Sequence, residues 1–190
     1  MLSIALFLDI LWVIFWAYWL ISATHSKKSA HSNTWWRGAI VRVIILILVL
    51  WYFRGPNEVS LFIVYANPYI HNIVLNIVGL LLWFLGVGFA VWARVYLGKN
   101  WGMPMSLKEQ PELVTSGPYK YVRHPIYSGF LLALIASYFV SGIFWLLIFI
   151  VSGTYFIYSA IVEEKNMAKL FPDVYPEYKK RTKMFIPFVF

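Results

Sequence analysis

Long apolar runs limit what this chain can fold into more than any other feature of its sequence. Residues 143–162 hold no charged side chain, and only Ser141 and Gly142 separate them from the apolar run 126–140. An apolar run of about 20 residues is long enough to cross the hydrocarbon core of a bilayer as a helix. Backbone groups in lipid must find their hydrogen bonds within such helices. The sequence therefore predicts an all-α integral membrane protein.

About five membrane-spanning helices are expected in a single domain, residues 1–190. The predicted spans are approximately residues 2–23, 38–53, 73–96, 126–140 and 143–162. Asp9 is the one charge in the first span, and residues 59–69 are an apolar segment too short to span, which we place in the interface or in a re-entrant loop. The third span contains Gly79, Gly86 and Gly88, small residues that allow helices to approach closely. The short connection at Ser141-Gly142 predicts an antiparallel helical hairpin.

Composition narrows the classes of function. The chain is 61% hydrophobic and has a mean hydropathy of +0.70, which points to the lipid bilayer as its environment. It contains no Cys, which excludes disulfides and thiolate chemistry, and its four scattered His predict no metal site. The net charge of +8 is explained by Lys and Arg residues in cytoplasmic loops, which lie beside an anionic leaflet. Nucleic acid is not an expected partner, because no basic face alternates with exposed aromatic residues.

The distribution of Lys and Arg predicts the topology. These residues concentrate in segments 27–42 and 94–123 and again after Glu164, whereas the second loop has only Arg54 and the hairpin turn has none. The positive-inside rule then places the N-terminus outside and both the central loop and the C-terminal tail in the cytosol. No N-terminal cleavage signal is recognisable, so the first apolar run is expected to remain as a helix. Two polar segments far apart in sequence are thereby placed on one membrane face.

The central loop leads into a helix through Arg123-His124-Pro125. Pro fits the first turn of a helix, where its missing N–H has no partner to lose. A helix N-terminus presents free N–H groups and a partial positive charge, which suit a carboxylate or a phosphate. Arg123 adds a forked donor, and His124 adds a group that donates or accepts. The alternative is that Arg123 anchors the chain to headgroups and that His124 is a satisfied interfacial residue.

Glu163 and Glu164 directly follow the last span, at a cytosolic helix end. Both the helix dipole and the positive-inside bias disfavour carboxylates there, so the pair needs a counter-cation. Arg123, a Lys or a cationic ligand could supply it; the alternative is an exposed acidic cap neutralised by Lys165 and Lys169. An anion-binding helix start and a carboxylate pair on one face suit a zwitterionic, cationic ligand such as S-adenosylmethionine. No dinucleotide, Walker or zinc-protease pattern is present.

Several short patterns then occur in a characteristic order. They are Gly86-x-Gly88, Leu97-Gly98-x-x-Trp101, Leu113-Val114-Thr115-Ser116-Gly117-x-Tyr119, Arg123-His124-Pro125-x-Tyr127-x-Gly129, Glu163-Glu164 and Phe171…Tyr175-x-x-Tyr178. The combination covers roughly residues 79–178. It resembles the isoprenylcysteine carboxyl methyltransferase family, which is related to the phospholipid N-methyltransferases.

This resemblance implies a membrane methyltransferase with a cytosolic cap enclosing S-adenosylmethionine and a lipophilic or small acceptor entering from the bilayer. The cofactor-binding residues that it implies are Leu113, Val114, Gly117, Tyr119, Arg123, His124, Pro125, Tyr127, Glu163 and Glu164. Glu163 and Glu164 would hold the ammonium or ribose of the cofactor. His124, Arg123 and Glu163 are the expected catalytic residues.

Two departures from the family pattern bear on the acceptor. Carboxyl methyltransferases of this family carry an Arg where this chain has Ser159, and tend to carry a His where it has Pro111. A prenylcysteine carboxylate is therefore disfavoured, and a phospholipid, amine or thiol acceptor is the alternative. Direct displacement at the sulfonium methyl is the expected reaction, with His124 or a carboxylate as the base for a neutral acceptor. A non-catalytic scaffold or a solute carrier is the rival class, although the nearly bare spans argue against a carrier.

Overall fold

The computed structural model describes residues 4–25, 27, 29–30, 43–47, 72–102 and 104–189. Its elements are α1 (Ile4–Ala23), β1 (Ser29–Ala30), α4 (Ile73–Leu97), η2 (Gly98–Asn100), β2 (Leu107–Lys108), η3 (Gly117–Lys120), α5 (Pro125–Ser141), α6 (Ile143–Leu170) and α7 (Tyr175–Arg181). Residues 43–47 are helical. The rest of the predicted span 38–53, and the apolar segment 59–69, lie outside the described residues.

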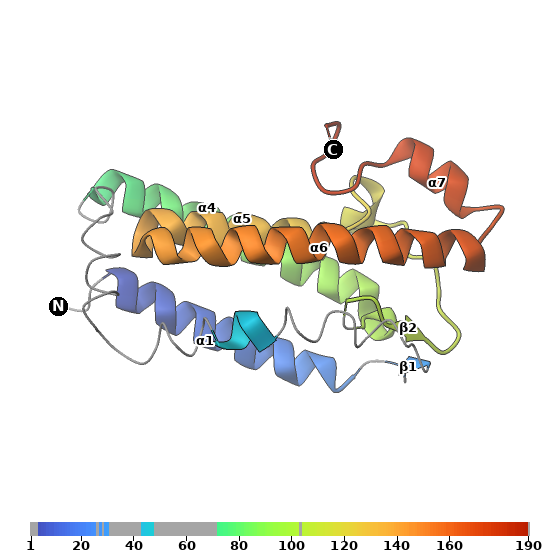
Figure 1. Cartoon of the computed structure of the whole chain (residues 1–190), viewed down its shortest axis with the longest axis horizontal. Coiled ribbons are helices and arrows are strands. Elements are labelled where there is room, and N and C mark those ends of the chain that lie inside the picture. Colours follow the sequence, from blue (N-terminus) through green and yellow to red (C-terminus); the bar gives the residue numbers. More distant parts are fainter. Residues whose placement is uncertain are drawn as a thin grey trace.

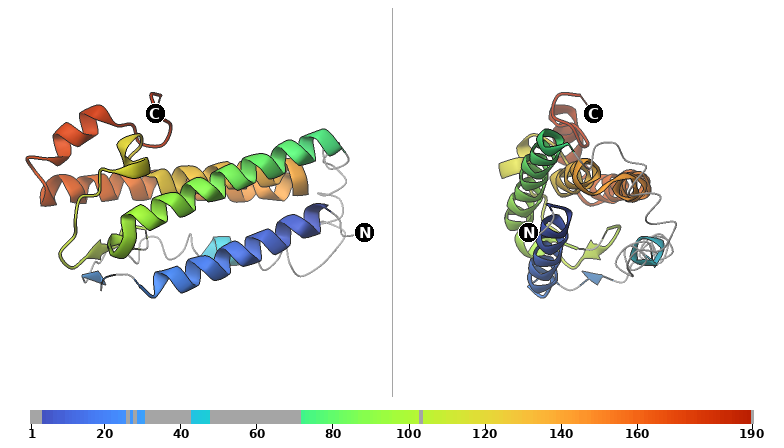
Figure 2. Two further views of the ribbon diagram at one scale, coloured as in Figure 1. Left: turned by 180° about the vertical axis from the view of Figure 1, so that it is seen from behind. Right: turned by 90° about the vertical axis from the view of Figure 1, so that its left-hand side faces the viewer.

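The long helices α1, α4, α5 and α6 run alongside one another over the length of the molecule (Figure 1). Helices α1, α4 and α6 run toward one end, and α5 runs back from it, which agrees with the predicted directions of these spans and with the predicted hairpin (Figures 1 and 2). The short β1–β2 pair, η3 and α7 all lie at that same end. We call it the polar end of the molecule.

Three helices are long and apolar enough to cross a membrane: α1, α4 with the turn that follows it, and α6; α5 is a shorter apolar helix. The chain is therefore an all-α, multi-pass membrane protein, as predicted. Helix α6 differs from the predicted span because it has 28 residues and continues to Leu170. At a rise of 1.5 Å per residue it is about 42 Å long, against a hydrocarbon core of about 30 Å. Glu163 and Glu164 thus lie inside a helix that projects beyond the core, not at a helix end.

The helix boundaries follow from local sequence. Asn72 caps α4, and its side chain accepts hydrogen bonds from the backbone N–H groups of Val74 and Leu75. Pro125 occupies the first turn of α5. Gly142 separates α5 from α6 with a φ of 97°, a conformation that L side chains rarely adopt. These three residues mark the start of α4, the start of α5 and the boundary between α5 and α6.

Glycines set the distance between α4 and α5. A Cβ atom built on Gly86 would lie 2.7 Å from both the backbone N of Ala133 and the backbone O of Gly129, and one built on Gly129 would lie 2.5 Å from the backbone O of Gly86. The close approach predicted from small residues therefore holds at Gly86. It does not hold at Gly88, whose Cβ would meet no atom of the described residues within 4 Å because it faces away from α5.

This difference gives a matched pair of variants. Gly86→Ala is expected to destabilise the fold by roughly 1–3 kcal/mol, because backbone atoms of α5 cannot move away without separating the helices. Gly88→Ala is expected to be neutral or slightly stabilising, because Ala is the better helix former and has open space. Thermal unfolding in detergent measures both, and equal melting temperatures for the two variants would contradict the packing described here.

Aromatic rings fix α1 against the hairpin of α5 and α6. Trp12 stacks on Trp145 at a centroid distance of 5.3 Å and meets the ring of Trp83 edge-on at 5.6 Å. Its indole Nε1 also donates a hydrogen bond of 3.0 Å to the hydroxyl of Ser137. Both the ring contacts and this bond lie in the buried core, so they hold the four helices in one arrangement and place their ends together.

Candidate functional site

The site forms where the start of α5 meets the C-terminal segment that follows α7. The backbone N–H of Arg123 donates to the carbonyl of Lys183 at 2.8 Å, and that of His124 donates to the carbonyl of Met184 at 3.1 Å. The hydroxyl of Ser128 donates to the carbonyl of Phe185 at 2.7 Å. The C-terminal segment therefore accepts hydrogen bonds from the backbone N–H groups and the hydroxyl at the start of α5. The side chains of Arg123 and His124 are directed at α6.

Glu164 is the buried anchor of the site. Its side chain is 5% exposed, and its Oε1 and Oε2 lie 2.6 Å from Arg123 Nε and from Lys179 Nζ, respectively. Arg123 also donates through Nη1 to the backbone carbonyls of Thr182 and Lys179. Because Nε and Nη1 of Arg123 both have protein partners, Arg123 links Glu164 to the end of α7. Glu164 is ionised because it lies between two cations.

Glu163 is the more accessible member of the carboxylate pair, with 26% of its side chain exposed. Its Oε1 accepts hydrogen bonds of 2.6 Å from the Tyr127 hydroxyl and 2.9 Å from the backbone N–H of Met105. Its Oε2 lies 3.5 Å from Nδ1 of His124. No Lys or Arg among the described residues pairs with Glu163. Its charge is therefore held in place by neutral donors and by His124.

His124 lies between the two carboxylates and belongs to a stack of rings. Its Nε2 is 3.6 Å from Glu164 Oε1, and its ring lies parallel to that of Tyr127 at 5.5 Å. Tyr127 stacks in turn on Phe156 at 4.5 Å, and Phe185 packs against both His124 and Tyr127. The carboxylates thus border an aromatic wall, which is an arrangement suited to a cation with apolar surroundings.

This geometry brings together five of the residues predicted from sequence. Arg123, His124, Tyr127, Glu163 and Glu164 come from α5, from α6 and from the loop before α5, and they form one network of hydrogen bonds and ion pairs. Comparisons with known proteins identify the fold that carries it. The sequence model of the phospholipid methyltransferase family matches residues 74–174, just over half of the chain.

The chain belongs to the phospholipid methyltransferase family. The five residues of this network all lie within the matched range. Lys179, which pairs with Glu164, lies beyond it. The family is the one to which the sequence patterns pointed through their resemblance to isoprenylcysteine carboxyl methyltransferases, and that resemblance is confirmed.

Curated relatives match parts of the chain. It is 40% identical over 78 residues to methanethiol S-methyltransferase 1 of Bradyrhizobium diazoefficiens, covering 40% of this chain and 27% of the relative. It is 32% identical over 101 residues to protein-S-isoprenylcysteine O-methyltransferase of Schizosaccharomyces pombe, covering 51% and 43%. It is 35% identical over 81 residues to methanethiol S-methyltransferase of a Pseudomonas species, covering 43% and 31%. The chain thus matches less than half of the length of each relative.

The other predicted site residues lie in the loop before α5 and at its start. Leu113 and Val114 are partly buried, Pro125 is fully buried, and Val114 packs against the core. Gly117 has a φ of 58°, and a Cβ there would lie 2.4 Å from the ring of Tyr96, so only Gly fits. Contact of these residues with a cofactor stays a prediction.

A hydrogen bond between two tyrosines secures the same loop. Tyr119 is buried, and burial raises the pKa of its hydroxyl. Tyr178 of α7 donates a hydrogen bond of 2.7 Å to the carbonyl of Tyr119, and burial raises the pKa of Tyr178 to about 12. Both hydroxyls therefore keep their protons across the physiological range, and the tie between α7 and η3 does not depend on pH there.

Sequence reasoning missed several residues of this site. Lys179 pairs with Glu164, the backbone of Met105 donates to Glu163, and Phe156 and Phe185 complete the aromatic wall. The sequence did show that the carboxylate pair needs a cation, but it could not select Lys179 from the basic residues of the tail. The N–H of Met105 and the two rings carry no signal of their own in the sequence.

The position of His124 between two carboxylates makes a pH-dependent contribution to stability. Burial lowers the pKa of His124, but hydrogen bonding and charge attraction from Glu163 and Glu164 outweigh burial, so that the pKa is raised above its ordinary value. A raised pKa in the folded state means that protonated His124 stabilises the fold. This contribution is complete below about pH 6.5, the unfolded value, and is lost as the pH rises through the folded value.

We expect the wild type to lose thermal stability between pH 6 and pH 9, and His124→Asn to reduce this loss. The control is His25→Asn, because His25 is exposed at the end of α1 and should leave the pH profile unchanged. Melting temperatures measured in detergent across this range give the profiles. The assignment fails if the His124 variant and the wild type lose stability in parallel.

Proposed function

We propose that this protein transfers the methyl group of S-adenosylmethionine to a small or lipophilic neutral nucleophile, with a thiol as the leading acceptor. The observation that carries the proposal is the partly exposed Glu163 carboxylate, fixed by Tyr127 and Met105 beside a wall of aromatic rings. Membership of the phospholipid methyltransferase family supports the reaction class. The polar end of the molecule, in this proposal, faces the cytosol and the N-terminus faces outward.

The donor set fits the cofactor. S-adenosylmethionine offers a sulfonium and an ammonium, and Glu163 is a carboxylate without a Lys or Arg partner among the described residues. The Nε2 atom of His124 is buried and faces Glu164 Oε1 at 3.6 Å, so Glu163 is the member of the network that is open to a cationic ligand. Arg123 fits its predicted role of binding the cofactor directly less well than Glu163 does. Its Nε and Nη1 already donate to Glu164 and to the carbonyls of Thr182 and Lys179.

The roles of the chain's own residues follow from these contacts. When bound, S-adenosylmethionine supplies an electrophilic methyl group on a sulfonium whose leaving group is a neutral thioether. Glu163 offsets the positive charge and accepts the proton that an acceptor thiol releases. His124, whose pKa the two carboxylates raise, orients Glu163 and leaves Glu163 to act as the base. Tyr127, Phe156 and Phe185 exclude water from the reacting groups.

The chemical class of the methyl acceptor is inferred from the absence of an Arg at position 159. Ser159, which stands where carboxyl methyltransferases carry an Arg, is fully buried and donates its hydroxyl to the carbonyl of Tyr155 at 2.8 Å. It therefore cannot orient a carboxylate. Two of the relatives above are methanethiol S-methyltransferases, which favours a thiol. A phospholipid amine is the second candidate, favoured by the match to the phospholipid methyltransferase family.

A labelled-methyl assay tests the proposal. The purified full chain is given methyl-labelled S-adenosylmethionine and, separately, methanethiol, phosphatidylethanolamine and a prenylcysteine. We expect label in the volatile thioether and little in the prenylcysteine ester. Label in the lipid alone would select the second candidate. Failure to label any of the three would count against methyl transfer as the function.

The proposed sidedness has its own test, because the chain has no native Cys. Lys120→Cys in η3 and Lys180→Cys in α7 place single thiols on exposed positions at the polar end. In sealed inside-out vesicles both should react with a membrane-impermeant maleimide, and in intact cells neither should. Opposite labelling of the two positions would refute a site shared by the central loop and the tail.

A further inference from the structure

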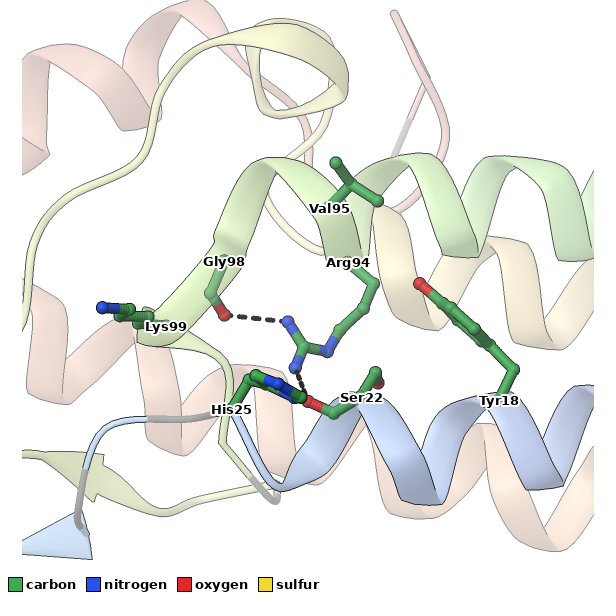
Figure 3. Close-up of a pocket in the computed structure, with 7 residues that line it drawn as sticks. All are labelled: Tyr18, Ser22, His25, Arg94, Val95, Gly98 and Lys99. Carbon is green, nitrogen blue, oxygen red and sulfur yellow. Dashed lines mark hydrogen bonds between the residues drawn. The ribbon is translucent and has the colours of Figure 1, made fainter.

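A pocket separate from the carboxylate site lies between the last turns of α1 and α4. Its volume is about 240 Å³, and it shares no lining residue with the network around Glu163 and Glu164. The pocket is lined by residues from α1 and the turn after it and by residues from the end of α4 and from η2, among them Tyr18, Ser22, His25, Arg94, Gly98 and Lys99 (Figure 3). Three of these carry positive or protonatable groups, and none is acidic.

Arg94 is the central group of this pocket. Its residue is 5% exposed, and Figure 3 shows its guanidinium extending from α4 toward the end of α1. Nη1 donates to the carbonyl of Gly98 at 2.8 Å, and Nη2 donates to the carbonyl of Ser22. The guanidinium also lies 4.8 Å from the centre of the Trp101 ring. Its Nε is buried and has no hydrogen-bond partner in the part of the chain that the structure describes.

The charge of Arg94 is not balanced by the described residues. None of the carboxylates that the structure describes forms an ion pair with it, whereas Arg123 is paired with Glu164. The two carbonyls accept hydrogen bonds but carry no net charge, so a full positive charge remains in a nearly buried position. A buried cation without an anion is costly, and a ligand oxyanion would remove that cost. Lys99 at the rim adds to the positive potential.

The pocket lies at the level expected for lipid headgroups. Helices α1 and α4 are both long enough to span, and the pocket lies where both end, at the polar end of the molecule (Figure 1). Lipid headgroups occupy this level of a bilayer. We propose that the Arg94 pocket binds the phosphate of an anionic lipid headgroup, held by the charge of the guanidinium and by its Nε, which is not among the donors to Gly98 and Ser22. The inference does not depend on methyl transfer.

Native mass spectrometry of the full chain in detergent tests this assignment. The probes are phosphatidylglycerol and phosphatidylcholine with the same acyl chains. The wild type should retain phosphatidylglycerol in preference, because the positive pocket repels the choline ammonium. Arg94→Gln should weaken its retention about tenfold, since hydrogen bonds to a charged group are lost. Lys120→Gln, which removes an exposed Lys outside the pocket, should not.

A second variant guards against misfolding, because Arg94 also ties the ends of α1 and α4 together. The double variant His25→Gln/Lys99→Gln keeps those bonds and should still weaken retention severalfold. Equal retention of the two lipids by the wild type, or equal phosphatidylglycerol retention by the wild type and both pocket variants, would overturn the proposal. Displacement of the lipid by millimolar inorganic phosphate would instead assign the pocket to a free anion and reject the lipid.

Discussion

Replacing Glu163 by Gln is expected to lower the rate of methyl transfer by about 10²–10³-fold, a loss typical of removing one preorganised charge-stabilising group. Gln preserves the shape of the side chain, and its carbonyl oxygen can still accept hydrogen bonds from Tyr127 and from the backbone of Met105. The substitution removes only the negative charge. The folded structure should therefore persist while the charge that offsets a sulfonium is lost.

The control for this variant is Glu177→Gln. Glu177 is 63% exposed and pairs with Lys180 on the surface of α7, so its loss should leave the rate unchanged. Initial rates with saturating acceptor, together with melting temperatures of all three proteins, separate a catalytic effect from a folding effect. A Glu163→Gln enzyme that is stable and works at the wild-type rate would remove Glu163 from the mechanism.

Replacing Arg123 by Ala is expected to have the largest effect on stability. The side chains of Arg123 and Glu164 are 8% and 5% exposed, so the change leaves a buried carboxylate with Lys179 as its remaining close cation. Removing one partner of a buried ion pair costs about 3–5 kcal/mol. Arg123 also donates to the carbonyls of Thr182 and Lys179, so two further hydrogen bonds to the end of α7 are lost, while the backbone bonds to Lys183 and Met184 remain.

Two comparisons make this expectation specific. Lys180→Ala breaks the exposed pair with Glu177 and should cost less than about 1 kcal/mol. The double variant Arg123→Ala/Glu164→Gln should recover part of the loss, because the unpaired charge is then absent. Unfolding free energies from denaturant titration measure all three. A small effect of Arg123→Ala, equal to that of Lys180→Ala, would show that the pair does not anchor the site.

The sequence determined most of the described architecture because bilayer physics leaves few choices. Apolar length predicted the helices found at α1, α4, α5 and α6, and Pro125 and Gly142 marked real boundaries. The end of α6 was misplaced because hydropathy marks where the hydrocarbon ends, not where the helix ends. Residues after Glu163 are good helix formers, and the helix stops only before Pro172, which disfavours a helical residue ahead of it.

The site was predictable at the level of charges but not of contacts. Two carboxylates against the local charge bias indicated that a cation must be near, and Arg123 is one. The division of labour between Glu163 and Glu164 was not predictable, since it depends on which carboxylate faces α7 and which faces Tyr127. Arg94 gave no signal in the sequence either, because its burial arises from packing between α1 and α4.

Direct binding of S-adenosylmethionine to the full chain in lipid nanodiscs without an acceptor, measured by calorimetry, tests the central claim that this carboxylate network holds a sulfonium cofactor. The account predicts one saturable site per chain in the wild type and in Glu177→Gln. It predicts binding weakened by at least about tenfold in the stable Glu163→Gln variant, in line with the loss of one charged contact. Absence of binding by the wild type at millimolar ligand, or equal affinity in Glu163→Gln, would contradict it.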